Sequence, residues 1–219
     1  EDCTGGGILR LILDSLRRFN LPILQLRGQA YDGAANMSGA YAGCQALLKQ
    51  HCSTALYVHC GAHCINLVME NVACSVAVVR DAIQCVHDVG TLSSQSTKFK
   101  NLFKSVSVET GNATTKTLRP LCPTRWTVRV AGIESVLLQY TAIITTMEQH
   151  SKSNSSMESC ARAAGLQDRL SKGNTYAYLT IAVVVFKHLE NLCVSLQSRS
   201  QTVCGTRKAV DIVPHELIR

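Results

Sequence analysis

The stretch LPILQLRGQAYDG, residues 21–33, decides how the rest of the chain is interpreted. Its first part, Leu21–Leu26, is mostly apolar and predicts a buried strand that leads into Gly28. The Asp32-Gly33 step is a turn signal and marks the point where the chain leaves the sheet. We therefore expect an acidic side chain at the end of a buried strand.

The elements predicted around this stretch alternate between helix and strand. They are a helix over Ile8–Phe19, a helix over Met37–His51, a strand over Ala55–Cys60 and a long helical pattern from Ile65 to Val86. Thr4 stands where the N-cap of the first helix is expected. Alternating strands and helices with short connections predict an α/β layered core.

The second half of the chain has a different pattern, because beyond Trp126 it contains helical segments and no convincing strand. They span about Val128–Gln149, Met157–Leu170 and Tyr176–Gln197. The sequence therefore predicts an α/β domain over residues 1–120 and an α-helical region over residues 121–219.

Composition narrows the class of protein. The 219 residues are 46% hydrophobic and 17% charged, as in a globular protein. The formal charge of 22 − 15 = +7 fits a nucleic-acid partner, although many soluble proteins are as basic.

Eleven cysteines without a secretory signal favour a reducing compartment, the cytosol or nucleus. The longest apolar run, Tyr176–Phe186, is too short to span a bilayer, so no membrane association is expected. Because the chain opens without an initiator Met, we expect a fragment.

Asp32 has two interpretations. A carboxylate at the end of a strand can ligate a hard divalent cation such as Mg²⁺, which prefers oxygen ligands. Alternatively, Asp32 and Asn36 form a polar turn in which Asp32 caps the helix that begins near Met37. One carboxylate alone does not make a metal site.

Cys60, His63 and Cys64 are spaced to share one face of a helix. Cys and His are zinc ligands, but a structural zinc site needs four of them and no second pair has ligand spacing. Cys52 and His59 are the only further candidates nearby. A buried His–Cys cluster at a strand-to-helix junction is the alternative interpretation.

The only tryptophan follows a basic residue in Thr124-Arg125-Trp126. Trp126 can anchor the core where the helical region begins, with Arg125 reaching solvent.

Three segments together resemble the core of transposases of the hobo–Activator–Tam3 (hAT) superfamily. They are GQAYDGAANMSG at 28–39, VHCGAHCINLV at 58–68 and CPTRW at 122–126. The nearer resemblance is to the transposon-derived branch that includes zinc finger MYM-type protein 1-like proteins. It spans roughly residues 8–200 and implies a partial RNase H-like core with few strands, followed by an α-helical insertion region.

The resemblance also implies roles for particular residues. Asp32 would be the second acidic ligand of a catalytic triad that holds Mg²⁺ or Mn²⁺. His63 would lie beside the scissile phosphate, where an imidazole can donate a hydrogen bond. Trp126 would stack on a flipped base, and Arg125 and Arg129 would face phosphates.

The chain departs from the family pattern at the other two acids. Upstream, Asp2 and Asp14 lack the strand setting expected of the first Asp. Downstream, no glutamate lies in a motif that matches the expected last Glu; the candidates are Glu134, Glu158, Glu190 and Glu216.

Two functions are consistent with these features. The first is part of a transposase-like protein whose ancestral reaction was metal-dependent DNA strand cleavage and transfer, inactive alone. The second is a domesticated, non-catalytic module that binds DNA or protein. Both functions predict a nuclear protein that has DNA as a partner. Both also predict that a protein partner or a second copy of the chain contacts the helical region.

Overall fold

The structure, a computed structural model, describes residues 2–111, 117–122, 129–198, 200 and 203–217. The chain divides into two compact units, Glu1–Ile65 and Asn66–Arg219, and the division falls inside helix α4 (Gly61–Ser75). The sequence places its boundary later, near residue 120. The difference has a packing reason, since α5 (Ala77–Gln95) and α6 (Thr97–Glu109) contact helices from the second half of the chain.

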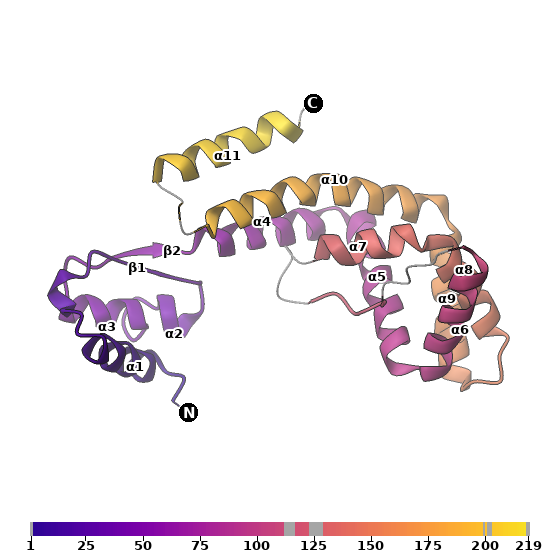
Figure 1. The fold of residues 1–219 in the computed structure, drawn as a ribbon, viewed down its shortest axis with the longest axis horizontal. Coiled ribbons are helices and arrows are strands. Elements are labelled where there is room, and N and C mark those ends of the chain that lie inside the picture. Colours follow the sequence, from indigo (N-terminus) through magenta and orange to yellow (C-terminus); the bar gives the residue numbers. More distant parts are fainter. Residues whose placement is uncertain (1, 112–116, 123–128, 199, 201–202, 218–219) are drawn as a thin grey trace. The chain divides into compact units, whose positions relative to one another are not determined.

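The first unit contains the two strands found in the described part of the chain (Figure 1). Its elements before α4 are α1 (Gly5–Arg18), a 3₁₀ helix (Ile23–Gln25), β1 (Gly28–Tyr31), α2 (Ala35–Ser38), α3 (Cys44–His51) and β2 (Leu56–His59). The strands pair in parallel, with Gly28 opposite Leu56 and Tyr31 opposite His59. A parallel pair with intervening helices agrees with the predicted α/β class, while the chain as a whole is mostly helical.

The core of the first unit lies between α1 and α3. Leu9, Cys44 and Leu48 are its buried residues, and Tyr31 of β1 packs against them. The N-terminus of α1 is capped as predicted, because the Thr4 hydroxyl accepts a hydrogen bond from the Gly7 N–H at 3.1 Å. This small core connects β1 to the two helices and thereby holds the sheet in place.

The strand predicted over Leu21–Leu26 is wrong. This segment forms the 3₁₀ helix, and the strand begins later, at Gly28. Ile23 and Leu26 are three residues apart, which puts both on one side of a 3₁₀ turn and against the core. Leu21 and Leu24 are exposed, so the apolar run is not a buried strand.

The single helix predicted over Met37–His51 is also wrong, because the segment forms α2 and α3 with a break between them. Gly39 ends α2 and Gly43 precedes α3. A Cβ at Gly43 would overlap the backbone of Gly39, so the chain can fold back here only without side chains.

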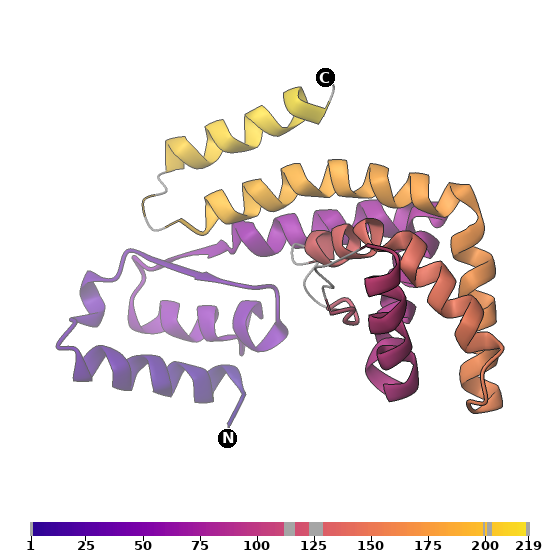
Figure 2. The same cartoon turned by 45° about the vertical axis from the view of Figure 1, so that its right-hand side comes forward.

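All the regular elements in the described part of the second unit are helices. After α4, α5 and α6 come α7 (Arg129–Leu138), α8 (Tyr140–Ser151), α9 (Met157–Ser171), α10 (Gly173–Leu196) and α11 (Val203–Leu217). Figure 2 shows α8 beside both α6 and α9, in agreement with their contacts. The largest fully buried side chains of this unit include Phe99, Ile143, Met147 and Phe186.

The long helical pattern predicted from Ile65 to Val86 corresponds to two helices. Val76 is extended, with φ −108° and ψ 98°, and α4 and α5 make an angle of 108°. The apolar side chains near the bend, Val72, Val76 and Val78, are exposed, whereas Ile83 and Val86 are buried. The apolar period therefore crosses a change of direction rather than marking one buried face.

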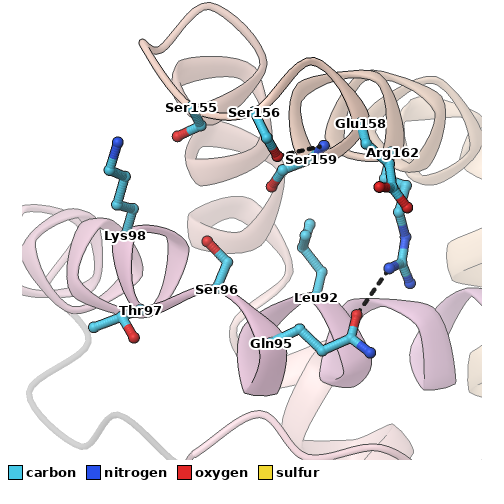
Figure 3. A pocket seen from close by; sticks show the side chains of 10 residues that line it. All are labelled: Leu92, Gln95, Ser96, Thr97, Lys98, Ser155, Ser156, Glu158, Ser159 and Arg162. Carbon is cyan, nitrogen blue, oxygen red and sulfur yellow. Dashed lines mark hydrogen bonds between the residues drawn. The ribbon is translucent and has the colours of Figure 1, made fainter.

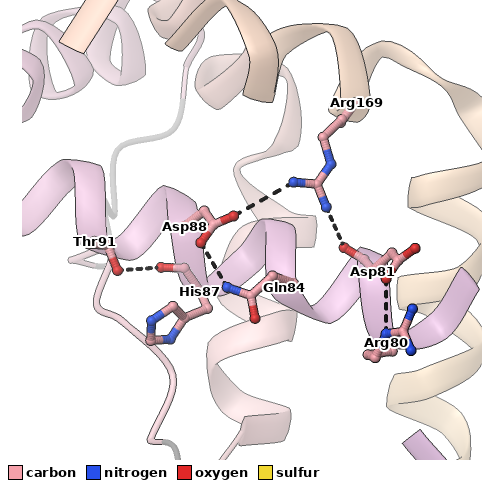
Figure 4. A network of polar contacts seen from close by, with 7 residues as sticks. All are labelled: Arg80, Asp81, Gln84, His87, Asp88, Thr91 and Arg169. Atoms are coloured by element: carbon pink, nitrogen blue, oxygen red, sulfur yellow. Dashed lines mark hydrogen bonds and ion pairs between the residues drawn. The ribbon is translucent and has the colours of Figure 1, made fainter. Parts of the chain in front are cut away.

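A polar network joins α9 to α5 (Figure 4). Arg169 Nη2 donates to the Asp81 carbonyl at 3.0 Å, and Nη1 lies 3.6 Å from an Asp88 carboxylate oxygen. The other Asp88 oxygen accepts from Gln84 Nε2 at 2.8 Å. Because the guanidinium contacts two points along α5, it fixes the register between the two helices.

One helix of the described residues, α10, is long and apolar enough to cross a membrane by length and composition. It has 24 residues and a mean hydropathy of 1.6 over its 18-residue window. The number rises to three if the bent pairs α4–α5 and α7–α8 are each counted as one span. The apolar run Tyr176–Phe186 is only part of this longer helix, so its length does not decide membrane association, whose absence stays a prediction.

Candidate functional site

The parallel pairing of β1 and β2 brings the first two sequence motifs to one edge of the sheet. Tyr31 and His59 are opposite each other at the ends of their strands, and the Cys60 N–H donates to the Tyr31 carbonyl at 2.8 Å. Asp32 follows β1 directly, and Cys60 follows β2. Since the carboxyl ends of parallel strands lie at the same edge, the Asp32-Gly33 turn and the start of α4 are neighbours.

Two imidazoles lie against the turn. The rings of His59 and His63 are stacked, with centroids 5.4 Å apart and planes 28° from parallel. A Cβ built on Gly33 would lie 3.3 Å from His59 Cε1 and 3.8 Å from His63 Nε2. The turn therefore approaches both rings closely at a residue that has no side chain.

The Asp32 carboxylate is exposed and takes part in the turn itself. Its Oδ1 accepts the Ala34 N–H at 3.2 Å, which is the geometry of an Asx turn. No hydrogen bond or ion pair joins it to His59 or His63 within the described part of the chain. The prediction that Asp32 takes part in a polar turn is thus confirmed.

The capping interpretation is wrong in its detail. The N-cap of α2 is Ala34, and no side chain caps that helix. Asn36 lies inside α2, where its Nδ2 donates to the Cys3 carbonyl at 2.8 Å and ties the helix to the start of the chain. Asp32 therefore stabilises the turn that precedes α2 and does not cap the helix.

The cysteines beside His63 are free thiols. Cys60 and Cys64 are half-buried, and neither forms a disulfide. Cys52 lies elsewhere, with its Sγ 3.1 Å from the Thr54 hydroxyl, and this hydrogen bond lowers the pKa of its thiol. Cys52 therefore does not complete a ligand set with His63.

The residues at this edge do not fit a divalent metal on their own. No group of three or more His, Cys, Asp and Glu side chains is placed to hold a metal ion anywhere in the described residues. Mg²⁺ and Mn²⁺ need several converging oxygen ligands, and the turn supplies the one carboxylate of Asp32.

The third motif falls mostly outside the described residues, and Arg125 and Trp126 are among those not described. Arg129 begins α7, and its Nε donates to the Cys122 carbonyl at 2.8 Å. The Arg129 side chain is partly withdrawn from solvent, and this burial lowers its pKa. Within the described chain Arg129 anchors the backbone of Cys122, and its predicted phosphate contact stays a prediction.

The segment that precedes the third motif packs on α5. The Leu121 carbonyl lies 3.2 Å from His87 Nδ1, and Leu118 and Leu121 are buried. Gly90 of α5 lies directly under the backbone of Arg119. The position of residues 117–122 is therefore set by a close helix-to-backbone contact.

Sequence reasoning missed two residues that shape the site. The sequence indicates His59 only as a further candidate zinc ligand, yet its ring stacks on His63 and lies against the turn. Gln29 is the buried residue of β1, and its Nε2 donates to the carbonyls of Gln45 and Ala55 at 3.2 and 3.0 Å. The i, i+4 spacing of His59 and His63 was an available signal, whereas Gln29 gave none.

Comparison with known proteins finds a match at the start of the chain. The family described as DUF4371: ZMYM1/FAM200, RNase-like domain matches residues 1–43. The matched region contains the Asp32 turn and ends before β2. No solved structure is significantly similar to the chain. The similarity to a ZMYM1/FAM200 RNase-like domain agrees with the branch expected from the motifs and with a partial α/β core.

Proposed function

We propose that the chain is part of a transposon-derived, hAT transposase-like protein whose ancestral reaction was metal-dependent cleavage and transfer of DNA strands. We propose further that this chain alone binds DNA without cleaving it. The observation that carries the proposal is the parallel register of β1 and β2, which gives the Asp32-Gly33 turn and the His59 and His63 imidazoles one common edge. The match of residues 1–43 to an RNase-like domain supports the same origin.

The lack of cleavage follows from the ligands available. In-line displacement at a phosphodiester assisted by two metal ions needs several carboxylates from different elements. The described edge supplies Asp32, and the Asp32 Oδ1 already accepts the Ala34 N–H. We therefore derive no catalytic step through Mg²⁺ or Mn²⁺ in this chain. A complete site would need further acids that converge on Asp32.

DNA binding at this edge would use the two imidazoles. His59 is exposed and His63 is half-buried, so each can present a ring N–H to a phosphate oxygen. The formal charge of +7 adds a long-range attraction to the phosphate backbone. Arg125 and Trp126 are the further DNA contacts in this proposal, and Arg129 supports the chain ahead of them through Cys122.

A domesticated protein-binding module is the second candidate. The observation that favours it is the outer face of the sheet, where Leu56 and Val58 are 64% and 60% exposed. Strands of parallel sheets are normally covered on both faces. An exposed apolar strand therefore favours a protein partner at this face.

The test measures DNA binding and cleavage by the purified chain. Fluorescence anisotropy with a labelled duplex, repeated over a salt series, should give an affinity that falls steeply with salt. Replacing both His59 and His63 by Ala should raise the Kd by about a hundredfold, since each charge-assisted hydrogen bond contributes about tenfold. His51→Ala is the matched control, because His51 is an exposed histidine of the same unit that ends α3, ahead of the amino end of β2.

Two results would contradict the proposal. If the double histidine variant and the His51→Ala control bind DNA with equal affinity, His59 and His63 do not contact DNA. Cleavage of DNA by the wild-type chain in Mn²⁺ that disappears in Asp32→Ala would show a working metal site. A wild-type chain that fails to bind DNA would leave the protein-binding module as the better account.

A further inference from the structure

A polar cavity of about 370 Å³ lies in the second unit, and none of its lining residues belongs to the three motifs discussed above (Figure 3). It opens where α5 passes into α6 and where the loop after α8 passes into α9. This volume is within the range of small-molecule sites. Most of its lining side chains carry a hydroxyl, an amide or a charge, so a ligand here would be held by polar contacts.

Two cationic side chains border the cavity from different helices. Lys98 of α6 donates from Nζ to the Asn154 carbonyl at 3.1 Å, and Arg162 of α9 donates from Nη1 to Gln95 Oε1 at 2.9 Å. Neither forms an ion pair with a carboxylate within the described chain. A lysine has three donor hydrogens and an arginine five, so both keep donors for a further acceptor.

Ser96, Ser156 and Ser159 also line the cavity, as Figure 3 shows. Ser96 caps α6 and Ser156 caps α9, each accepting a backbone N–H at 3.2 and 3.3 Å. Because a capping hydroxyl uses a lone pair, its own hydrogen is free to donate. Ser159, from the first turn of α9, lies 2.8 Å from His150 Nε2. The centre of the cavity is therefore rich in donors.

The balance of charge favours an anion. Lys98 and Arg162 contribute two positive charges, and Glu158, which also lines the cavity, contributes one negative charge. Glu158 precedes Arg162 by four residues, the favoured spacing for a helical ion pair, yet no such pair forms because Arg162 extends to Gln95. The arginine is thus held toward the cavity instead of being neutralised on its own helix.

We propose that this cavity binds a small phosphate-bearing ligand. The hydroxyls of Ser96 and Ser156 donate to the phosphate oxygens, and Lys98 and Arg162, which lie at opposite ends of the cavity lining in Figure 3, attract the anion by their charge. Glu158 faces the non-phosphate part of the ligand, where it accepts from a hydroxyl or amino group. The site does not depend on the Asp32 edge or on the proposed function.

The test uses inorganic phosphate as the probe and the full chain as the protein. Phosphate should raise the melting temperature of the wild-type chain above that in chloride of equal ionic strength. Isothermal titration should show the Kd for phosphate rising by about tenfold or more in Lys98→Gln and in Arg162→Gln. Lys100→Gln is the matched control, because Lys100 is an exposed lysine of α6 that does not line the cavity.

Three results would overturn the inference. The first is an equal effect of phosphate and chloride on the wild-type chain, and the second is binding of phosphate by the two cavity variants as tight as that of Lys100→Gln. Circular dichroism of each variant distinguishes lost binding from lost folding. Lastly, a duplex DNA that displaces phosphate from the wild-type chain and binds more weakly to Lys98→Gln and Arg162→Gln would assign the cavity to the DNA backbone in place of a small ligand.

Discussion

The contact between Gly90 and the backbone of Arg119 predicts that Gly90→Ala destabilises the second unit. Gly90 lies inside α5, and a Cβ there would approach the Arg119 carbonyl and the Pro120 nitrogen more closely than the 3.0 Å that Cβ atoms keep. Both neighbours are backbone, so neither can rotate away. The whole segment 117–122 must shift to admit one methyl group.

The magnitude follows from two opposing terms. Adding a methyl group to a tightly packed site costs roughly 1–3 kcal/mol. Alanine in a helix interior is favoured over glycine by about 1 kcal/mol, which offsets part of that cost. If the segment detaches instead, the burial of Leu118 and Leu121 is lost, at roughly 1.5–3 kcal/mol for each. Because the atoms that the new Cβ meets are backbone, we take the upper end of the packing cost and expect the free energy of unfolding to fall by about 2 kcal/mol.

Urea unfolding followed by circular dichroism measures this change. Gly165→Ala is the matched control, since Gly165 is an exposed glycine inside α9 and a Cβ there meets nothing within 4 Å. This control should gain about 0.5–1 kcal/mol from helix propensity alone. The two substitutions are chemically identical and should have opposite signs. If Gly90→Ala is as stable as Gly165→Ala, the placement of residues 117–122 on α5 is wrong.

Three further predictions concern single interactions. Thr4→Ala removes the acceptor for the Gly7 N–H and should lower the free energy of unfolding of the first unit by about 1 kcal/mol, measured by thermal denaturation with Thr4→Ser as control. Tyr140→Phe removes the hydroxyl that donates to the Leu170 carbonyl at 2.8 Å and should cost about 1 kcal/mol in urea unfolding; an unchanged midpoint would contradict that bond. Burial, with a smaller contribution from Lys98, holds the pKa of His150 below its ordinary value of 6.5. The unfolded chain therefore takes up this proton first, so stability should be full above pH 6.5 and fall as the pH drops below it. His150→Gln should weaken this dependence, and an unaltered pH profile would exclude His150 as its source.

Local signals in the sequence predicted the elements that local chemistry determines. The Thr4 cap, the turn at Asp32-Gly33 and the strand that ends at His59 all depend on residues within a few positions. The apolar run Leu21–Leu26 was misassigned because a short run fits a strand or a 3₁₀ turn equally well, and only burial distinguishes them.

The pairing of distant segments could not be predicted in the same way. Nothing near Tyr31 indicates that His59 will lie opposite, because a parallel register depends on how the intervening helices pack. The bend at Val76 was missed because valines continue the helical period through it. Likewise, the grouping of α5 and α6 with the later helices arises from long-range contacts.

The most direct test of the central claim is nuclear Overhauser spectroscopy of the isotope-labelled chain. The claim is that the Asp32-Gly33 turn and the His59 imidazole meet at the end of a parallel strand pair. A Cβ at Gly33 would lie 3.3 Å from His59 Cε1, so a cross-peak is expected between the Gly33 α protons and the His59 ε1 proton. Cross-strand peaks should accompany it in the register that pairs Tyr31 with His59. An antiparallel pattern, or the absence of both signals, would contradict the account.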